Sequence, residues 1–172
     1  MGDPGAAGRA GGDVEPDRPL TIRAGVALAG GVGGGKPRAG PAERKSAAVT
    51  GGNRNLDIAP NSISVGQNFH VMRKAGRVEN FQPHMHLRGK DYEVRVTYPT
   101  GESQTVFKGL WNFDWQLGYQ LEKPLIVPKG TKIMSIAHYD NSANNKYNPD
   151  PSKDVLWGDQ NWEEMQSGFL GL

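Results

Sequence analysis

The chain has 172 residues, which is enough for one domain or for one domain with a tail. Its 20 basic and 18 acidic residues give a formal net charge of +2, so there is no surplus of positive charge to suggest a nucleic acid partner. The absence of cysteine excludes disulfides, thiolate metal sites and cysteine nucleophiles. No apolar run approaches the roughly 20 residues of a membrane helix, so we expect no membrane span.

The composition changes sharply near residue 52. The first 50 residues contain 12 of the 24 glycines, whereas every aromatic residue, every asparagine and every histidine comes after residue 52. A segment rich in Gly, Ala, Pro and Arg buries too little apolar surface to offset the entropy lost on ordering. We therefore expect residues 1–52 to form a disordered tail and residues 53–172 to form the folded domain.

One segment of the tail, residues 30–36, matches the G-x-x-x-x-G-K pattern of a phosphate-binding loop. Pro37 follows it, and proline offers neither the hydroxyl for Mg²⁺ nor an N–H for the phosphate. In so glycine-rich a stretch the match is expected by chance, and nucleotide binding is not predicted.

From residue 53 onward the apolar pattern is typical of β-strands. The stretch from Trp111 to Leu121 alternates large apolar and polar side chains without a break, which predicts a strand that lines the core. No stretch of ten or more residues shows a helical apolar period, so we expect an all-β fold, an antiparallel sandwich or jelly roll. The turn at Pro128–Gly130 should join a hairpin. The expected strands are residues 55–61, 64–73, 92–98, 104–108, 111–121, 124–127 and 132–139.

Two of the four histidines, His84 and His86, lie two residues apart. In an extended chain such side chains leave the same face about 7 Å apart, so both imidazoles can bind one metal ion. Met85 should point to the opposite face and is not expected to be a ligand. The same spacing also occurs on polar strand surfaces, so spacing alone leaves both interpretations open.

The other two histidines are weaker candidates. His138 is in phase with Met134 and Ile136, on a face that we expect to be internal. A hydrogen-bonded core histidine is the favoured interpretation, and a metal ligand or a residue that supports one is the alternative. A three-histidine zinc site of His84, His86 and His138 is a further possibility. His70 lies in a strand without clear alternation.

Two loops have compositions that suggest other ligands. Residues 140–151 are dense in Asn, Asp and Pro, whose oxygens can bind Ca²⁺, but the spacing of a calcium-binding loop is missing and Asx turns are favoured. Trp157 and Trp162 flank the turn at 158–161 and would suggest carbohydrate stacking if exposed, although packing is their commoner role. A non-catalytic metal- or carbohydrate-binding sandwich therefore stays open as an alternative.

Five segments of the chain form a recognisable set: the motifs His84–Lys90, Tyr139–Ser142 and Glu164-Met165, and the further segments Asn148–Pro151 and Trp157–Gln160. The three motifs, in this order, resemble the C-terminal catalytic domain of the copper type II, ascorbate-dependent monooxygenases, the family of peptidylglycine α-hydroxylating monooxygenase and dopamine β-monooxygenase. The two further segments are similar to the bacterial branch of that family. The resemblance extends from about Asn55 to Phe169.

The resemblance implies that one copper ion is held by His84, His86 and Met165. Imidazole binds both oxidation states of copper, and a thioether favours Cu(I), the state that reacts with O₂. The implied activity is hydroxylation of a C–H bond in a small-molecule substrate, with O₂ and an external reductant such as ascorbate. The family also implies an extracytoplasmic location, although residues 23–29 are too short and glycine-broken to make a convincing signal peptide.

Two departures from the family bear on its activity here. Amidating members bind a substrate carboxylate through Arg, Asn and Tyr at the positions of Gln82, Ser167 and Phe169, so a glycine-extended peptide is not the expected substrate. The family's second copper is held by histidines of a preceding domain, and residues 1–52 contain no histidine. We therefore expect full turnover to require an upstream domain, a partner chain or an external reductant.

Overall fold

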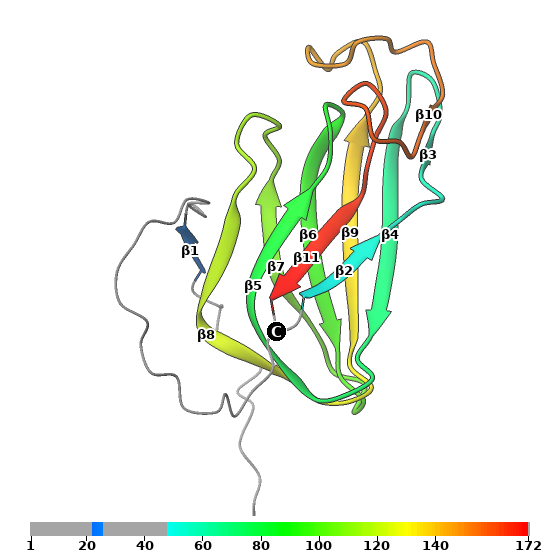
Figure 1. Cartoon of the computed structure of the whole chain (residues 1–172). Coiled ribbons are helices and arrows are strands. Elements are labelled where there is room, and N and C mark those ends of the chain that lie inside the picture. The colour runs from blue at the N-terminus through cyan, green and yellow to red at the C-terminus, as the bar shows by residue number, and fades with distance from the viewer. Residues whose placement is uncertain (1–21, 26–47, 172) are drawn as a thin grey trace, which may run out of the picture.

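The computed structural model describes residues 22–25 and 48–171, which form strands, turns and loops (Figure 1). Within these residues there is no helix, and hence none that is long and apolar enough to cross a membrane. The strands are β1 (Ile22–Gly25), β2 (Ala48–Gly52), β3 (Asp57–Ile58), β4 (Ile63–Val71), β5 (Gly76–His84), β6 (Gly89–Thr97), β7 (Ser103–Leu110), β8 (Gly118–Val127), β9 (Lys132–Asp140), β10 (Val155–Leu156) and β11 (Ser167–Gly171).

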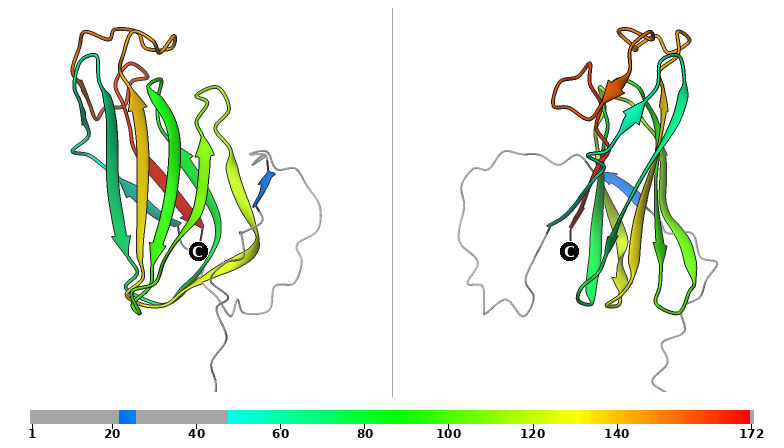
Figure 2. Two further views of the ribbon diagram at one scale, coloured as in Figure 1. Left: turned by 180° about the vertical axis from the view of Figure 1, so that it is seen from behind. Right: turned by 90° about the vertical axis from the view of Figure 1, so that its right-hand side faces the viewer.

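The strands form two larger sheets that face each other, as Figure 2 shows from the side. The first sheet has the order β1-β8-β5-β11-β2 and the second has the order β4-β9-β6-β7. β3 and β10 make a small two-stranded sheet, and all strand pairs are antiparallel. The predicted all-β antiparallel sandwich is confirmed.

The core lies between the two larger sheets, and alternation along each strand supplies its side chains. In β6, Tyr92, Val94 and Val96 are buried, as their alternation predicts. The turn after β6 is closed by a hydrogen bond from the Gly101 N–H to the Tyr98 carbonyl, with Gly101 in the left-handed region at φ 93°. Further buried apolar residues are Val78, Phe81, Leu121, Leu125, Val127 and Leu170 in the first sheet and Phe107, Ile133, Ala137 and Tyr139 in the second.

The predicted strand from Trp111 to Leu121 is wrong in its first half. Residues 111–117 form a loop, and β8 begins only at Gly118. The Asn112 side chain accepts the Asp114 N–H at 3.0 Å, and its carbonyl accepts the Trp115 N–H at 3.0 Å. This Asx turn reverses the chain and leaves Trp115 exposed, although the apolar alternation of the sequence continues.

The predicted hairpin around Pro128–Gly130 is also wrong. β8 pairs with β1 and β5, whereas β9 pairs with β4 and β6, so the turn carries the chain from one sheet to the other. The expected entry strand at 55–61 is reduced to the two residues of β3. Local alternation predicts that strands exist, but it does not predict which strands pair.

The expected disordered tail needs correction at two places. β1 pairs with β8, and β2 pairs with β11, so both belong to the first sheet. The boundary expected between residues 52 and 53 therefore falls at the end of a paired strand. Gly-rich residues 30–36, with their chance resemblance to a phosphate-binding loop, lie outside the described residues.

Candidate metal centre

His84 and His86 lie at the end of the sandwich where the loops between strands gather, at the top of Figure 1. β5 ends at His84, and β6 begins at Gly89. The two imidazole rings have centroids 5.1 Å apart and are nearly perpendicular, at 82°. His86 is buried and His84 is half-buried. Met85 between them is fully buried and belongs to the hydrophobic core.

The orientation of His84 is fixed by Gln116. The two side chains meet with Nδ1 of His84 2.7 Å from Oε1 of Gln116, while Nε2 of Gln116 donates to the Phe113 carbonyl at 3.1 Å. Because this second bond turns the amide oxygen toward the ring, Nδ1 of His84 must carry the proton. The lone pair of the neutral ring therefore lies on Nε2, the tautomer that a metal ligand needs.

His86 is held in the same tautomer by a backbone carbonyl. Its Nδ1 lies 3.3 Å from the Glu163 carbonyl oxygen, which can only accept a hydrogen bond. Burial lowers the pKa of His86, and the neighbouring His84 lowers it further, against the raising effect of nearby backbone groups. The ring is therefore neutral at pH 7, with the lone pair on Nε2.

The carboxylate of Glu164 connects this loop to the C-terminal segment. Glu164 is completely buried and accepts backbone N–H bonds from His86 at 2.8 Å, Arg88 at 2.7 Å and Met165 at 3.0 Å. Burial raises the pKa of Glu164 to about 7, while the three amides and the Arg88 charge act in the opposite direction. A single side chain thus fixes the backbone on both sides of the candidate centre.

The backbone places Met165 beside the two histidines. Ser167 pairs with His84 across β11 and β5, and continuing this antiparallel register two residues before Ser167 and two residues after His84 brings the backbone of Met165 opposite that of His86. The same oxygen of Glu164 accepts the N–H groups of both His86 and Met165. The backbones of Met165 and His86 are therefore neighbours across the two segments.

Alternation gives the direction of the side chains. The residues on either side of Met165, Glu164 and Gln166, are completely buried, and Gln166 donates to the Gly66 carbonyl inside the sandwich. Met165 itself is half-buried and, on this alternation, faces away from the core. Two imidazoles and one thioether are a combination of donors that suits copper.

The side chain of Arg88 connects the His-x-His segment with the neighbouring loops. This side chain is buried and donates from Nε to Oδ1 of Asn141 at 2.8 Å and from Nη1 to the Trp162 carbonyl at 2.8 Å. Asn141 is completely buried and also donates to the carbonyls of Ala59 and Lys153. Arg88 therefore joins the His-x-His segment to both neighbouring loops.

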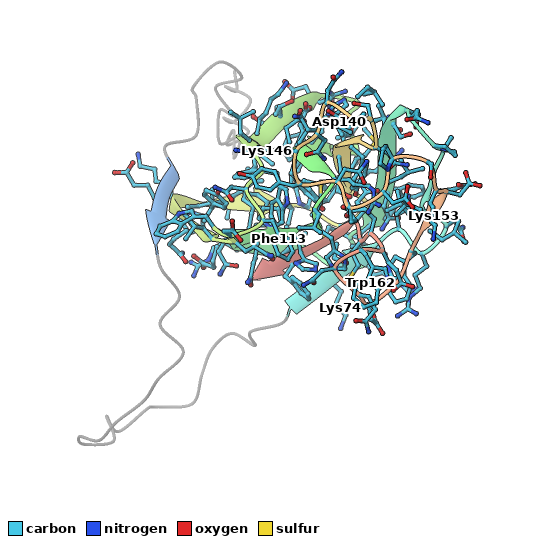
Figure 3. All side chains as sticks on the ribbon, turned by 90° about the horizontal axis from the view of Figure 1, so that it is seen from above. Lys74, Phe113, Asp140, Lys146, Lys153 and Trp162 are labelled. Carbon is cyan, nitrogen blue, oxygen red and sulfur yellow. The ribbon has the colours of Figure 1, made fainter. Side chains whose placement is uncertain are left out.

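Two aromatic side chains of the loop at 111–117 contact His86. Nε1 of Trp111 donates to the His86 carbonyl at 2.9 Å, and the Phe113 ring stands edge-on to His86 with centroids 6.5 Å apart. Figure 3, which looks onto this end of the sandwich, shows Phe113 near its middle.

Gly89 leaves room for Trp111, because a Cβ at position 89 would lie 2.6 Å from the Trp111 ring. A hollow of about 280 Å³ beside these rings is lined by Leu87, Lys90, Trp111, Phe113 and Tyr147, among others.

The structure corrects the expected place of His138. This residue lies on the outer face of the second sheet, where its Nδ1 is 2.6 Å from Oδ1 of Asp91 on the neighbouring strand. The internal face of β9 carries Ala137 and Tyr139 instead. Among the described residues, no three His, Cys, Asp or Glu side chains gather into a group that could hold a metal ion. The three-histidine zinc site is therefore not formed, and His70 stays apart on β4.

The loop at 140–151 forms turns, as expected. Its side chains accept backbone N–H groups two residues ahead, in five successive bonds: Asp140 from Ser142, Ser142 from Asn144, Asn145 from Tyr147, Asn148 from Asp150, and Asp150 from Ser152. The oxygens of these side chains thus serve the Asx and related turns that the composition predicts.

No protein-family model and no curated protein matches the chain. The relationship to copper monooxygenases therefore stays a resemblance, carried by three motifs of the sequence.

Sequence reasoning missed the residues that orient His84 and His86. Gln116 and the Glu163 carbonyl fix the two imidazoles, and Glu164 fixes the backbone around them. The Glu-Met motif contained one signal, since a carboxylate directly before a predicted ligand suggests a supporting role. No pattern in the sequence pointed to Gln116, which was assigned to a strand.

Proposed function

We propose that this chain is a copper-binding domain of a monooxygenase, with His84, His86 and Met165 as the protein ligands of one copper ion. The observation that carries the proposal is the fixed tautomer of both imidazoles. Each Nδ1 faces an oxygen acceptor, so the lone pair of each neutral ring is on Nε2. Bound copper would supply the redox chemistry with O₂ that hydroxylation of a substrate C–H bond requires.

The donor set favours copper over zinc. Structural and catalytic zinc sites are built from Cys, His, Asp and Glu, and no group of three such residues exists in the described part of the chain. A thioether is a soft donor that stabilises Cu(I). Met165 is therefore the residue that distinguishes this centre from a zinc site.

The residues around the ligands have defined tasks in this proposal. Gln116 and the Glu163 carbonyl hold the two Nδ1 protons, while Glu164 keeps the backbones of His86 and Met165 together. Such supporting bonds raise the basicity of an imidazole ligand and fix its direction.

The substrate in this proposal is not held by a carboxylate at the three positions that amidating members use. Gln82 pairs with Phe169, and His84 pairs with Ser167, so these four residues lie side by side across β5 and β11. Gln82, Ser167 and Phe169 offer no cation to a substrate carboxylate. The aromatic walls of the hollow beside Trp111 and Phe113 favour a substrate with an apolar part. Electrons would come from a second copper domain, a partner chain or a reductant such as ascorbate.

A second candidate function is a non-catalytic carbohydrate-binding domain. Trp115, Tyr147 and Trp162, in the loops at one end of the sandwich, are each more than half exposed. Exposed aromatic rings can stack on sugars, so this interpretation predicts binding without metal.

Copper binding and X-ray absorption test the main proposal. We expect Cu(I) to bind with one equivalent per chain and to show a copper–sulfur distance that disappears in Met165→Leu. Met134→Leu, a half-buried methionine on the outer face of β9, is the control and should keep it. Copper bound without sulfur in the wild-type chain would reject Met165, and sugar binding without copper affinity would favour the second candidate.

A further inference from the structure

β4 carries its apolar side chains on the side away from the core. Ile63, Val65, Phe69 and Val71 are exposed by 67%, 53%, 59% and 45% of their surface. The alternate positions, which face inward, are small or polar: Ser64, Gly66, Asn68 and His70. A strand that faces water on its outer side shows the opposite arrangement, with polar residues outward. Four large apolar side chains on one strand form a stripe typical of an interaction surface.

β4 is also an edge strand. In the second sheet it pairs with β9 on one side, and no described strand pairs with its other side, which forms the right-hand edge in Figure 1. Soluble proteins protect such edges with charged residues, proline or β-bulges. Residues 63–71 contain no charge and no proline, and their pairing with β9 runs through nine residues without a register shift. The backbone of β4 is therefore regular and ready to accept another strand.

The opposite edge of the same sheet is protected. β7 contains Lys108, and its pairing with β6 is interrupted by a register shift between Val94 and Arg95. A bulge and a lysine are both devices that discourage pairing with another chain. The two edges of this sheet thus differ in the features that decide whether a further strand can add.

The β4 sequence is complementary to itself in the antiparallel direction. When a second copy is placed with Gln67 opposite Gln67, Val65 comes opposite Phe69 and Ile63 comes opposite Val71. Every outward pair beyond the central glutamines is then apolar, and cross-strand apolar pairs stabilise a sheet. With a two-fold axis at Gln67, both copies use the same strand for the contact, so no free β4 edge is left for a third copy. The assembly therefore stops at a dimer.

We propose that two copies of this chain associate through β4, in an antiparallel pairing with its two-fold axis at Gln67. The two four-stranded sheets then form one continuous sheet of eight strands, and the two apolar stripes become adjacent. The metal centre is not involved in this contact. The proposal can therefore be tested without copper, and its failure would leave the proposed function untouched.

The mass in solution is the first test. The wild-type chain should have twice the monomer mass of 18.6 kDa at micromolar concentration, by light scattering coupled to size exclusion. Phe69→Lys puts a charge at a central pair and should give the monomer. Ile126→Lys on β8, where the side chain is 62% exposed, is the matched control and should remain dimeric. A monomeric wild-type chain, or equal behaviour of both variants, overturns the proposal.

Cysteine cross-linking tests the register, since the chain contains no cysteine of its own. Facing residues of antiparallel strands have Cα atoms about 4.5 to 5.5 Å apart, which suits a disulfide. Under mild oxidation Gln67→Cys should therefore form a covalent dimer rapidly, because the two thiols face each other.

Two variants serve as controls for the cross-link. Val65→Cys alone should form little dimer, since Val65 faces Phe69 of the other copy, but it should cross-link when mixed with Phe69→Cys. Lys108→Cys on the protected edge of β7 gives the rate of random collision. Gln67→Cys that forms dimer no faster than Lys108→Cys would refute the pairing, even if the wild-type chain is dimeric by another surface.

Discussion

The carboxylate of Glu164 accepts the backbone N–H of His86 at 2.8 Å, although the two residues are 78 positions apart in the sequence. Its second oxygen accepts the Arg88 N–H at 2.7 Å, and the first also accepts the N–H of Met165. The geometry of the candidate centre therefore depends on a residue that is not itself a proposed ligand.

Glu164→Gln should destabilise the domain. An amide keeps one acceptor oxygen but presents an NH₂ group where at least one backbone N–H now donates, so a buried donor loses its partner. A buried N–H group left without a partner costs about 1 to 3 kcal/mol, and we expect a loss of about 2 kcal/mol in urea unfolding followed by circular dichroism. Glu163→Gln is the control, because its side chain accepts only the Gln160 N–H in an exposed turn. Equal stability of the two variants would contradict this role.

Gln116→Leu should weaken copper binding without unfolding the domain. The substitution removes the acceptor that holds the Nδ1 proton of His84, so the ring can rotate or change its tautomer. Loss of such a supporting bond typically costs about 10-fold to 100-fold in metal affinity, and we expect an effect near the lower end. Competition with a Cu(I) chelator measures it. Gln120→Leu, which loses a bond to the Glu79 carbonyl on β5, should keep the wild-type affinity.

Gly89→Ala should disturb the packing around His86. The added Cβ would lie 2.6 Å from the Trp111 ring and 2.9 Å from the Met85 side chain, which is too close for either to stay in place. Overpacking of this kind costs about 1 to 3 kcal/mol, seen as a lower melting temperature and a shifted tryptophan emission. Gly118→Ala meets no atom within 4 Å and should leave both readouts unchanged. A fully stable Gly89→Ala protein would show that Trp111 is free to move.

Glu93→Gln should make the domain less dependent on pH in acid. Burial acts to raise the pKa of Glu93, but hydrogen bonds from Thr105 and Arg95, with the charges of Arg95 and Lys108, lower it below its ordinary value of 4.5. A lowered pKa in the folded state means that ionised Glu93 stabilises the fold above pH 4.5, and that this contribution is lost as the pH falls through the lowered pKa.

The free energy of unfolding at pH 7 and at pH 3 measures this effect of Glu93. The wild-type chain should lose more stability between the two values than Glu93→Gln does. Glu122→Gln, an exposed residue of β8, should lose as much as the wild type. An equal loss in all three proteins would show that the contacts of Glu93 do not favour its ionised form.

The sequence predicted the features that depend on neighbours along the chain. Tyr92, Val94 and Val96 alternate because one face of β6 is buried. The Asx turns at 140–151 follow from side chains that bond to backbone two residues ahead. In each case the physical cause lies within a few residues of its effect.

The features that were missed depend on residues far apart in the chain. The alternation from Trp111 to Leu121 predicted a strand, but the Asx turn at Asn112 makes residues 111–117 a loop. This loop brings Gln116 and Phe113 to the histidines. The sequence predicted an internal position for His138, which was wrong. Alternation separates the two faces of a strand, but it does not show which face packs against the other sheet. The role of Glu164 depends on the pairing of β11 with β5, which alternation does not predict.

The position of β11 has a consequence for the order of assembly. It follows every other described strand in the sequence, yet it lies in the interior of its sheet, between β5 and β2. Until residues 167–171 are present, β2 has no partner in this sheet and one side of β5 is unpaired. The first sheet can therefore be completed only when the last of the described strands has been made, so its assembly awaits the most distant part of the chain.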